Sequence, residues 1–247
     1  MKRLFDVVAS GLGLLVASPI LLPVMFLVWW QDKHSPLYVS PRVGEGGRSF
    51  KMVKLRSMII NADKSGIDST GADDRRITPV GHFIRRYKLD ELSQLWNVFV
   101  GDMSLVGPRP NVKRETDLYT PIESRLISVR PGITDFASIV FSDEGEILKN
   151  TTDPDIAYNQ LIRPGKSRLG LYYVDARSLW LDIQLCFITA VAIVSRPRAL
   201  SALQRVLDGL GAPEALKVIA SRSTPLVPTP PPGGDRIVTS RDGNPYV

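Results

Sequence analysis

The sequence predicts an α-rich α+β protein that is associated with a membrane. Three observations predict it: an uncharged apolar run near the N-terminus, one hairpin-like segment after it, and later segments with apolar residues at helical spacing. With 247 residues, the chain has room for one main domain and a small second element. We therefore expect a membrane helix, a small β-hairpin, a helical core and amphipathic helices at the lipid interface.

The N-terminal run is long enough to enter a membrane. No charged residue occurs from Val7 to Gln31, and VVASGLGLLVASPILLPVMFLVWW exceeds the roughly 20 residues of a spanning helix. Trp29 and Trp30 suit a membrane interface. A cleaved signal peptide fits less well, because the run exceeds the usual apolar core and no clear cleavage site follows it.

Ser18 and Pro19 lie in the middle of this run. Proline lacks the backbone donor and crowds the preceding turn, so we expect a break or kink there, with the Ser18 hydroxyl as a partner for a freed carbonyl. Basic residues flank both ends of the run, so the positive-inside rule favours neither side. The residues alone allow a kinked spanning helix and a re-entrant helix-break-helix with both ends in the cytoplasm.

Turn residues and apolar spacing predict the remaining elements. The Pro-rich segment from residue 221 predicts a disordered tail. The apolar stretch in 178–195 is too short to span a membrane, so it predicts a core helix or an interfacial helix. The expected elements are a hairpin at 37–54, a mobile loop at 61–74, and helices at 78–88, 90–100, 111–129, 153–161 and 178–195. The expected units are a membrane element at 1–32, a domain at 33–205, a helical extension at 206–220 and a tail at 221–247.

The charge and the rare residue types limit the chemistry. A net charge of +6 indicates anionic partners: nucleic acid, anionic lipid or phosphorylated small molecules. A basic surface kept for solubility or near a cytoplasmic leaflet explains it equally well. Basic and aromatic residues alternate too sparsely for a nucleic-acid surface. Cys186 is the only cysteine and there are two histidines, which disfavours a disulfide, a zinc site and Cys-His catalysis. A metal would therefore be a hard cation, which indicates Mg²⁺.

The segment 84–110, IRRYKLDELSQLWNVFVGDMSLVGPRP, holds the strongest candidates for chemistry. Asp90 and Glu91 begin an amphipathic stretch, where acidic residues often serve only to cap a helix. A carboxylate at a helix N-terminus near arginines also stays ionised and can attack phosphorus. Its neighbour can help to hold Mg²⁺, which neutralises phosphate charge. Asp90 and Glu91 are therefore candidate catalytic and metal-binding residues.

Cations around this pair are candidates for substrate binding, although each also reads as ordinary surface charge or as part of a turn. Arg85 lies five residues before Asp90 and can clamp phosphate oxygens. Pro108 and Pro110 restrict the backbone of Arg109, as a turn that holds a nucleotide would require. Further candidates are Lys54 and Arg56 at the end of the second hairpin strand, and Arg130 at another constrained turn. No Walker A loop, strand–helix GxGxxG or GxSxG motif occurs.

In these segments the chain resembles the bacterial sugar transferases, the monotopic polyprenyl-phosphate phosphoglycosyl transferases, in their minimal catalytic form. The resemblance covers roughly residues 1–200. Ser93 stands where proline is usual, and the sequence after VRPGIT departs from the common GWAQVNGR pattern. The segments that carry the resemblance are KRLFDVVASGLGLLVASP, FKMVKLRSM, RRYKLDELSQLWNVFVGDMSLVGPRP, VRPGIT and YYVDARSLWLDIQLCFIT.

The resemblance implies transfer of a phosphosugar from a UDP-sugar to undecaprenyl phosphate, giving a polyprenyl diphosphate sugar and UMP. It implies Asp90 as a nucleophile that forms a phosphosugar intermediate, Glu91 as its assistant through Mg²⁺, Arg85 at phosphate and Arg109, with its two prolines, near uridine. It also implies a re-entrant helix broken at Ser18-Pro19 and a catalytic domain on the cytoplasmic face of the bacterial inner membrane. The donor sugar, the glycan pathway and the oligomeric state, a homodimer among the possibilities, stay open.

Two functions of other classes fit parts of the sequence. A non-catalytic membrane scaffold of polysaccharide assembly would use the same apolar and basic features, but it has no need for Asp90, Glu91, Arg85 and Arg109 together. A membrane phosphohydrolase would also capture a phosphoryl group on Asp90, and it would release free sugar phosphate in place of lipid-linked sugar.

Overall fold

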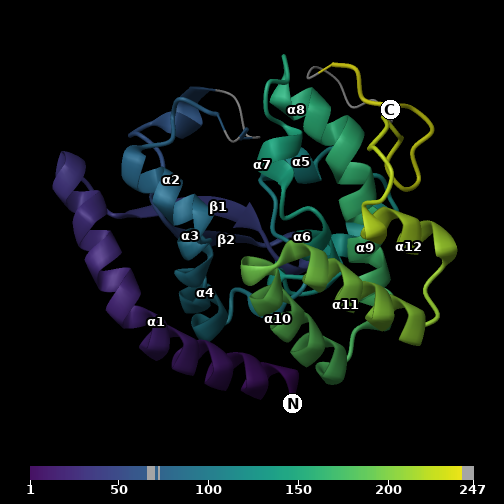
Figure 1. Cartoon of the computed structure of the whole chain (residues 1–247), viewed down its shortest axis with the longest axis horizontal. Coiled ribbons are helices and arrows are strands. Elements are labelled where there is room, and N and C mark those ends of the chain that lie inside the picture. Colours follow the sequence, from purple (N-terminus) through teal and green to yellow (C-terminus); the bar gives the residue numbers. More distant parts are fainter. Residues whose placement is uncertain (66–69, 72, 241–247) are drawn as a thin grey trace.

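The computed structural model describes residues 1–65, 70–71 and 73–240, and the rest of the predicted loop 61–74 and of the predicted tail lies outside them. Helices dominate, and two small sheets lie among them (Figure 1). The α-helices are α1 Lys2–Asp32, α2 Pro79–Arg86, α3 Leu89–Leu92, α4 Leu95–Val100, α5 Lys113–Thr116, α6 Phe136–Val140, α7 Glu144–Ile147, α8 Pro154–Ala157, α9 Arg163–Ala176, α10 Leu179–Val194, α11 Arg196–Gly209 and α12 Glu214–Ser221. The strands are β1 Leu37–Val43, β2 Ser49–Leu55, β3 Ser104–Val106 and β4 Gly132–Thr134.

Helix α1 is continuous through both of its prolines, where the residues predict a break or a kink at Ser18-Pro19 and the family resemblance implies two helices separated by a break. Figure 1 shows that the helix bends partway along its length instead. Pro19 cannot donate to the carbonyl of Leu15, four residues earlier. The Ser18 hydroxyl donates to that same carbonyl at 2.8 Å, which confirms the predicted role of this side chain. The chain therefore keeps its helical path because the freed acceptor has a local partner.

The N-terminal turn of α1 is fixed to the domain by polar contacts. The Lys2 ammonium lies 2.5 Å from the buried carboxylate of Asp182, and Asp6 accepts the backbone N–H of Leu105 at 3.0 Å. Arg3 donates to the carbonyls of Val98 and Phe99. Lys2 and Arg3 therefore serve as structural contacts as well as flanking charge.

The second half of α1 packs on the hairpin and on the helices that follow it. Leu21, Val24 and Val28 are buried in a cluster with Leu55 and Ile84. By length and composition α1 can cross a membrane, and only 22% of its most apolar window is buried. The rest of the protein thus leaves most of the apolar surface of α1 uncovered.

The predicted hairpin is confirmed as β1 and β2, an antiparallel pair in register from Leu37 opposite Leu55. The parallel pair of β3 and β4 was not predicted. Its strands approach so closely that a Cβ on Gly132 would lie 2.0 Å from the backbone nitrogen of Gly107. Glycine at these two positions therefore allows the pairing that leads directly into Pro108.

The main core lies among α6, α9, α10, α11 and α12. Phe136, Tyr173, Leu185 and Leu203 are each at most 1% exposed in one continuous cluster. The helix predicted at 178–195 is confirmed as α10, which buries Leu185 in this core and leaves its other face exposed. The helices predicted at 78–88 and 153–161 are confirmed as α2 and as α8 with a π-helical turn, Tyr158–Ile162, after it.

Two predicted helices were wrong in extent. The single helix expected at 90–100 is divided into α3 and α4 by a turn at Ser93 and Gln94, where the Ser93 hydroxyl donates to the carbonyl of Asp90 at 2.9 Å. The helix expected at 111–129 is reduced to α5 and a 3₁₀ segment, Glu123–Ser128. Thr120 and Glu123 cap each other's backbone N–H groups, so the chain starts a new turn there and does not extend α5.

The proline-rich tail, expected to be disordered, lies along the domain over its described part. The Thr120 hydroxyl donates to the carbonyl of Pro232, and Gln160 donates to the carbonyl of Val238 at 2.6 Å. Val238 is 5% exposed. Hydrogen bonds from Thr120 and from Gln160 of the π-helical turn therefore hold the tail as far as residue 238.

Candidate active site

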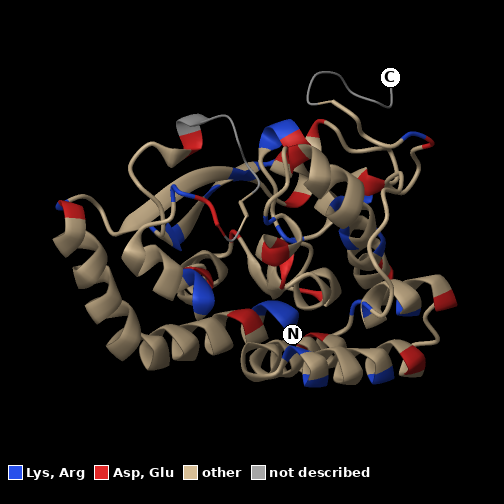
Figure 2. Ribbon diagram, turned by 45° about the horizontal axis from the view of Figure 1, so that its top comes forward, with Lys and Arg blue, Asp and Glu red and all other residues tan. Residues whose placement is uncertain are grey.

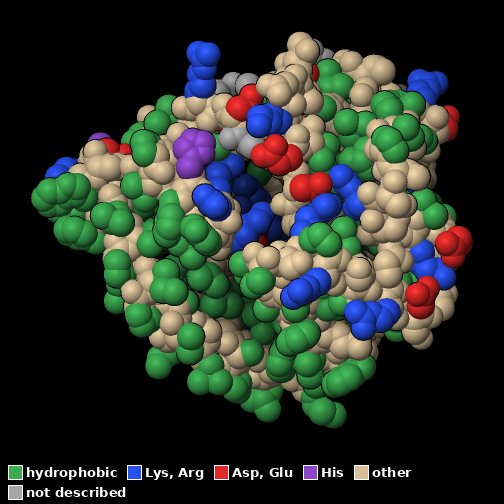
Figure 3. Space-filling view, in the orientation of Figure 1, with side chains coloured by type: hydrophobic (Ala, Val, Ile, Leu, Met, Phe, Trp, Pro, Cys, Tyr) green, Lys and Arg blue, Asp and Glu red, His purple; other side chains and the backbone are tan. Residues whose placement is uncertain are grey.

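A cavity of about 800 Å³ opens near the centre of the molecule, and it brings together most of the candidate residues. Figure 3 shows a hollow with Lys and Arg side chains inside it, and Figure 2 shows acidic and basic segments meeting around the same region. Its walls come from β2, the α2–α3 turn, the loop after β3, α7 and α9. The charged residues that line it include Lys54, Arg85, Lys88, Asp90, Glu91, Arg109, Glu144 and Lys166.

A sharp turn places Asp90 in this cavity. Lys88 adopts a left-handed conformation with φ of 55°, so the chain reverses between α2 and α3. Such a conformation costs a non-glycine residue about 1–2 kcal/mol, and the burial of Ile84 and Leu89 on either side offsets it. The turn therefore depends on packing, and it presents Asp90 and Glu91 at the start of α3.

One carboxylate oxygen of Asp90 is not satisfied by the protein. Asp90 Oδ1 is buried and has no hydrogen-bond partner among the described residues. A buried polar atom without a partner is costly, so it is usually compensated by a ligand, an ion or water. Asp90 Oδ1 is consequently a place in the cavity where a bound group would satisfy the protein.

Glu91 is held by Arg109. The Arg109 Nη1 donates to Glu91 Oε1 at 3.0 Å. Burial opposes ionisation of Glu91, but Arg109, Lys88 and Lys54 outweigh it, so the pKa of this carboxyl lies below its usual range. Glu91 in turn raises the pKa of Arg109. Both partners are charged at neutral pH, and the ion pair joins α3 to the loop after β3.

Two further cations complete this side of the cavity. Arg85 donates from Nε to the Ser57 hydroxyl at 3.0 Å, which orients its guanidinium. Burial is the main cause that lowers the pKa of Lys54 to about 8, and the positive charge of Arg109 adds to it. Among the described cations that line this cavity, Lys54 is therefore the one whose pKa is shifted close to neutrality.

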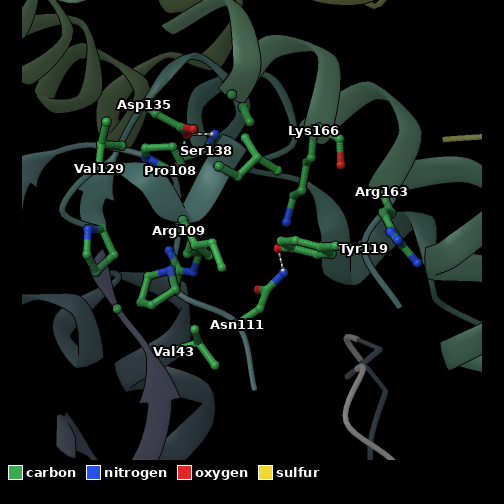
Figure 4. A pocket seen from close by; sticks show the side chains of 18 of the residues that line it. Val43, Pro108, Arg109, Asn111, Tyr119, Val129, Asp135, Ser138, Arg163 and Lys166 are labelled. Carbon is green, nitrogen blue, oxygen red and sulfur yellow. Dashed lines mark hydrogen bonds between the residues drawn. The ribbon is translucent and has the colours of Figure 1, made fainter. Parts of the chain in front are cut away.

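Residues 108–110 separate the large cavity from a smaller one of about 60 Å³. Arg109 and Pro110 line both cavities, and Pro108 lines the smaller one. Figure 4 shows Arg109 in the smaller cavity together with Asn111 and Tyr119, whose side chains are joined by a hydrogen bond of 2.8 Å. The loop predicted as a preorganised turn thus forms a wall between two hollows.

Two predicted substrate-binding residues lie elsewhere. Arg56 is 5% exposed and forms a bidentate ion pair with Asp32 at 2.5 and 2.7 Å, so it joins β2 to the end of α1. Arg130 lines neither cavity and lies 3.7 Å from Glu45 of the hairpin turn. Neither side chain therefore lines these two cavities with the other candidates, because a strand end or a turn fixes the backbone but not the direction of a long side chain.

The opposite wall was missed from the sequence. Glu144 on α7 pairs with Lys166 on α9, and both line the large cavity. Burial opposes ionisation of Glu144, but Lys166 outweighs it and lowers the pKa of this carboxyl. The acidic run DEGE after the VRPGIT segment was the only signal for Glu144, and Lys166 had none.

A metal ion would have few protein ligands here. The described residues contain no cluster of three or more His, Cys, Asp or Glu side chains suited to a metal. Asp90 offers the unpartnered Oδ1, while Glu91 already shares Oε1 with Arg109. Magnesium is often held by one or two carboxylates together with substrate phosphates, so this pair fits that ion.

A broad apolar surface accompanies the cavity. Trp96 and Phe99 on α4 and Trp180 and Phe187 on α10 are 41–71% exposed, and so are many apolar residues of α1. Figure 3 shows hydrophobic side chains crowded along the edges formed by these helices. Exposed apolar surface on this scale marks an interaction site or a membrane contact.

The sequence model of the bacterial sugar transferases matches residues 1–196, which include both carboxylates and every helix that forms this cavity wall. The chain belongs to the bacterial sugar transferase family. The match ends at Arg196, so α11, α12 and the tail lie almost wholly beyond the region that defines the family.

Several named proteins are similar to most of this chain. The UDP-N-acetylgalactosamine-undecaprenyl-phosphate N-acetylgalactosaminephosphotransferase of Aeromonas hydrophila is 32% identical over 79% of the chain and 44% of its own length. The undecaprenyl-phosphate glucose phosphotransferase of Komagataeibacter xylinus is 38% identical over 76% of the chain and 35% of its own length. The exopolysaccharide production protein ExoY of Sinorhizobium fredii is 34% identical over 78% of the chain and 84% of its own length. The chain thus spans less than half of the first two relatives.

Proposed function

We propose that the protein transfers a phosphosugar from a UDP-sugar to undecaprenyl phosphate, which initiates a membrane-linked glycan such as a capsule, an exopolysaccharide, an O-antigen or a glycoprotein glycan. The buried, unpartnered Oδ1 of Asp90 in a cavity lined with cations carries this proposal. Membership of the family and the names of its relatives support it.

In the first step, a carboxylate oxygen of Asp90 attacks the phosphorus that bears the sugar. The new O–P bond forms as the bond between that phosphorus and the bridging oxygen breaks, and UMP leaves with the electron pair. Arg85, Lys54 and Arg109 stabilise the charge that moves onto the phosphate oxygens. Asp90 then carries the phosphosugar as an acyl phosphate.

In the second step, a phosphate oxygen of the lipid attacks the same phosphorus. The acyl–oxygen bond to phosphorus breaks, which restores the Asp90 carboxylate and gives polyprenyl diphosphate sugar. Glu91 accepts the proton of the lipid phosphate where that group is protonated. Asp90 and Glu91 would also hold Mg²⁺, which supplies neutralising charge for the phosphate groups.

The direct test measures UMP release by the purified full chain. We expect repeated turnover of a UDP-sugar only when undecaprenyl phosphate and Mg²⁺ are both present, together with formation of lipid-linked sugar; without the lipid, release should stop at about one UMP per enzyme molecule, when Asp90 carries the phosphosugar. Free sugar phosphate in place of that lipid product would indicate a phosphohydrolase. No release with any UDP-sugar tested would contradict the proposed reaction.

The membrane arrangement has its own test. We propose that the bent α1 enters the inner membrane and returns, with the exposed apolar faces of α4 and α10 on the cytoplasmic leaflet. In a Cys186→Ser background, a cysteine added before Met1 and one at His34 should react with an impermeant thiol reagent from the same, cytoplasmic side. Labelling from opposite sides would show a spanning helix and overturn this arrangement.

The lowered pKa of Lys54 predicts a pH-dependent affinity for the donor. Lys54 is mostly charged at pH 7 and mostly neutral at pH 9, because its pKa is about 8. The contact with phosphate therefore weakens as the pH rises, and we expect the KM for the UDP-sugar to increase by up to about tenfold. Lys54→Arg keeps its charge over this range and should flatten the profile. An equal rise of KM in both proteins would exclude Lys54 as the cause.

A further inference from the structure

The wall of the cavity opposite Asp90 is held from outside by two arginines. Arg196 Nη2 lies 3.0 Å from Asp143 Oδ1, and Arg222 Nη2 lies 3.2 Å from Asp143 Oδ2. Arg196 also donates to the carbonyl of Val140 at 2.9 Å, and the Arg222 guanidinium lies over the ring of Phe141 at 5.1 Å. The loop that precedes α7 is thus tied to both α11 and the end of α12.

The side-chain contacts of Arg222 explain why an arginine occupies this position. It ends α12 with φ of 53°, a conformation that glycine adopts with less strain. Its side chain is 12% exposed and reaches the cavity loop from a helix outside the residues that match the family. The extension therefore supplies a contact that the family region alone does not contain.

Asp143 and the next residue, Glu144, both line the cavity, and Glu144 forms an ion pair there. Glu144 pairs with Lys166, and both line the wall across from Asp90 and Arg109. A carboxylate beside an ammonium presents an acceptor and a donor together, which is the combination that sugar hydroxyl and amide groups require. The cations Arg85, Lys54 and Arg109 occupy the other wall, where phosphates would bind.

We propose that the Glu144–Lys166 pair contacts the sugar of the donor and determines which UDP-sugar is accepted, and that Arg196 and Arg222 position this pair through Asp143. The proposal rests on the proposed function. Glu144 and Lys166 are specificity residues, whereas Arg196 and Arg222 do not line the cavity and are positioning residues that act through the Asp143 carboxylate at its wall.

The test compares UMP release from UDP-glucose, UDP-galactose and their N-acetylamino forms in wild type, Glu144→Gln, Arg222→Gln and Asp143→Asn. We expect each variant to change the ratio of kcat/KM between the best and the next-best sugar at least about fivefold, mainly through KM. The double variant Arg222→Gln/Asp143→Asn should resemble the single variants, because both changes break the same contact. Arg222→Lys should partly restore the wild-type ratio.

Lys217→Gln is the matched control. Lys217 also belongs to α12, but its ion pairs, with Asp208 and Glu214 at 3.0 and 3.2 Å, lie within the extension. In Lys217→Gln, the ratio of kcat/KM between the best and the next-best sugar should equal that of wild type.

An equal loss of activity on every sugar in Glu144→Gln would overturn the specificity role. An unchanged ratio in Arg222→Gln and Asp143→Asn would overturn the positioning role. If Arg222→Gln does not fold, Arg196→Gln decides the positioning role by the same ratio, because Arg196 contacts Asp143 from outside the cavity lining. A wild-type protein that releases no UMP from any sugar would instead contradict the proposed function.

Discussion

Asp90→Asn should lower the rate of phosphosugar transfer by at least about a thousandfold. A carboxamide oxygen is a poor nucleophile, so the first step loses its attacking group while the surrounding cations stay in place. The KM for the UDP-sugar should change little, because Arg85 and Arg109 still contact phosphate. The substitution is nearly isosteric, and the fold should be retained.

Two measurements check this result: UMP release and a denaturation-resistant phosphosugar adduct detected by mass spectrometry. The adduct should form on wild type when the donor is supplied without the lipid, and it should be absent from Asp90→Asn. Asp102→Asn is the matched control, since Asp102 is exposed and contacts Asn97 at 3.2 Å outside the cavity. Turnover by Asp90→Asn at a rate near that of wild type would remove Asp90 as the nucleophile.

Glu123→Ala should lower the free energy of unfolding by about 3–5 kcal/mol. Glu123 is fully buried, and it accepts hydrogen bonds from Arg163 at 2.6 and 3.1 Å and from the Ser167 hydroxyl at 2.6 Å. Truncation leaves the buried Arg163 charge without its main partner and also removes the cap of Thr120. The expected loss of stability exceeds the effect of most single substitutions, because the Arg163 charge remains where water cannot reach it.

Chemical denaturation of the detergent-solubilised protein measures this loss. Asp117→Ala is the control, because Asp117 forms an exposed ion pair with Lys113 on α5. Exposed pairs of this kind contribute less than about 1 kcal/mol. Equal effects of Glu123→Ala and Asp117→Ala would show that Arg163 finds another partner in the variant.

Elements with local signals were predictable from the sequence. The glycine-rich turn at 44–47 between two apolar strands gave the hairpin, and the apolar spacing of 178–195 gave α10. Asp90, Glu91 and Arg85 lie within one short segment, so their meeting at one cavity was predictable, whereas Lys54 and Arg109 join them through the packing of β2 on α3 and the ion pair with Glu91.

Features that depend on distant residues were not predictable. The partners of β3 and β4 lie 28 residues apart, and their three-residue strands carry no periodic signal. Arg56 follows a strand as a ligand-binding cation would, but Asp32 neutralises it through packing of α1 on the hairpin. Glu144 and Lys166 meet only because α7 and α9 face the same cavity.

The ion pair of Lys2 with Asp182 joins the first turn of the chain to a residue 180 positions later. During synthesis, α1 leaves the ribosome long before its partner exists, and chains acquire structure from the N-terminus onward. Asp6 likewise waits for residues 104 and 105. The contact that fixes the first turn of α1 to Asp182 therefore cannot form until α10 has emerged.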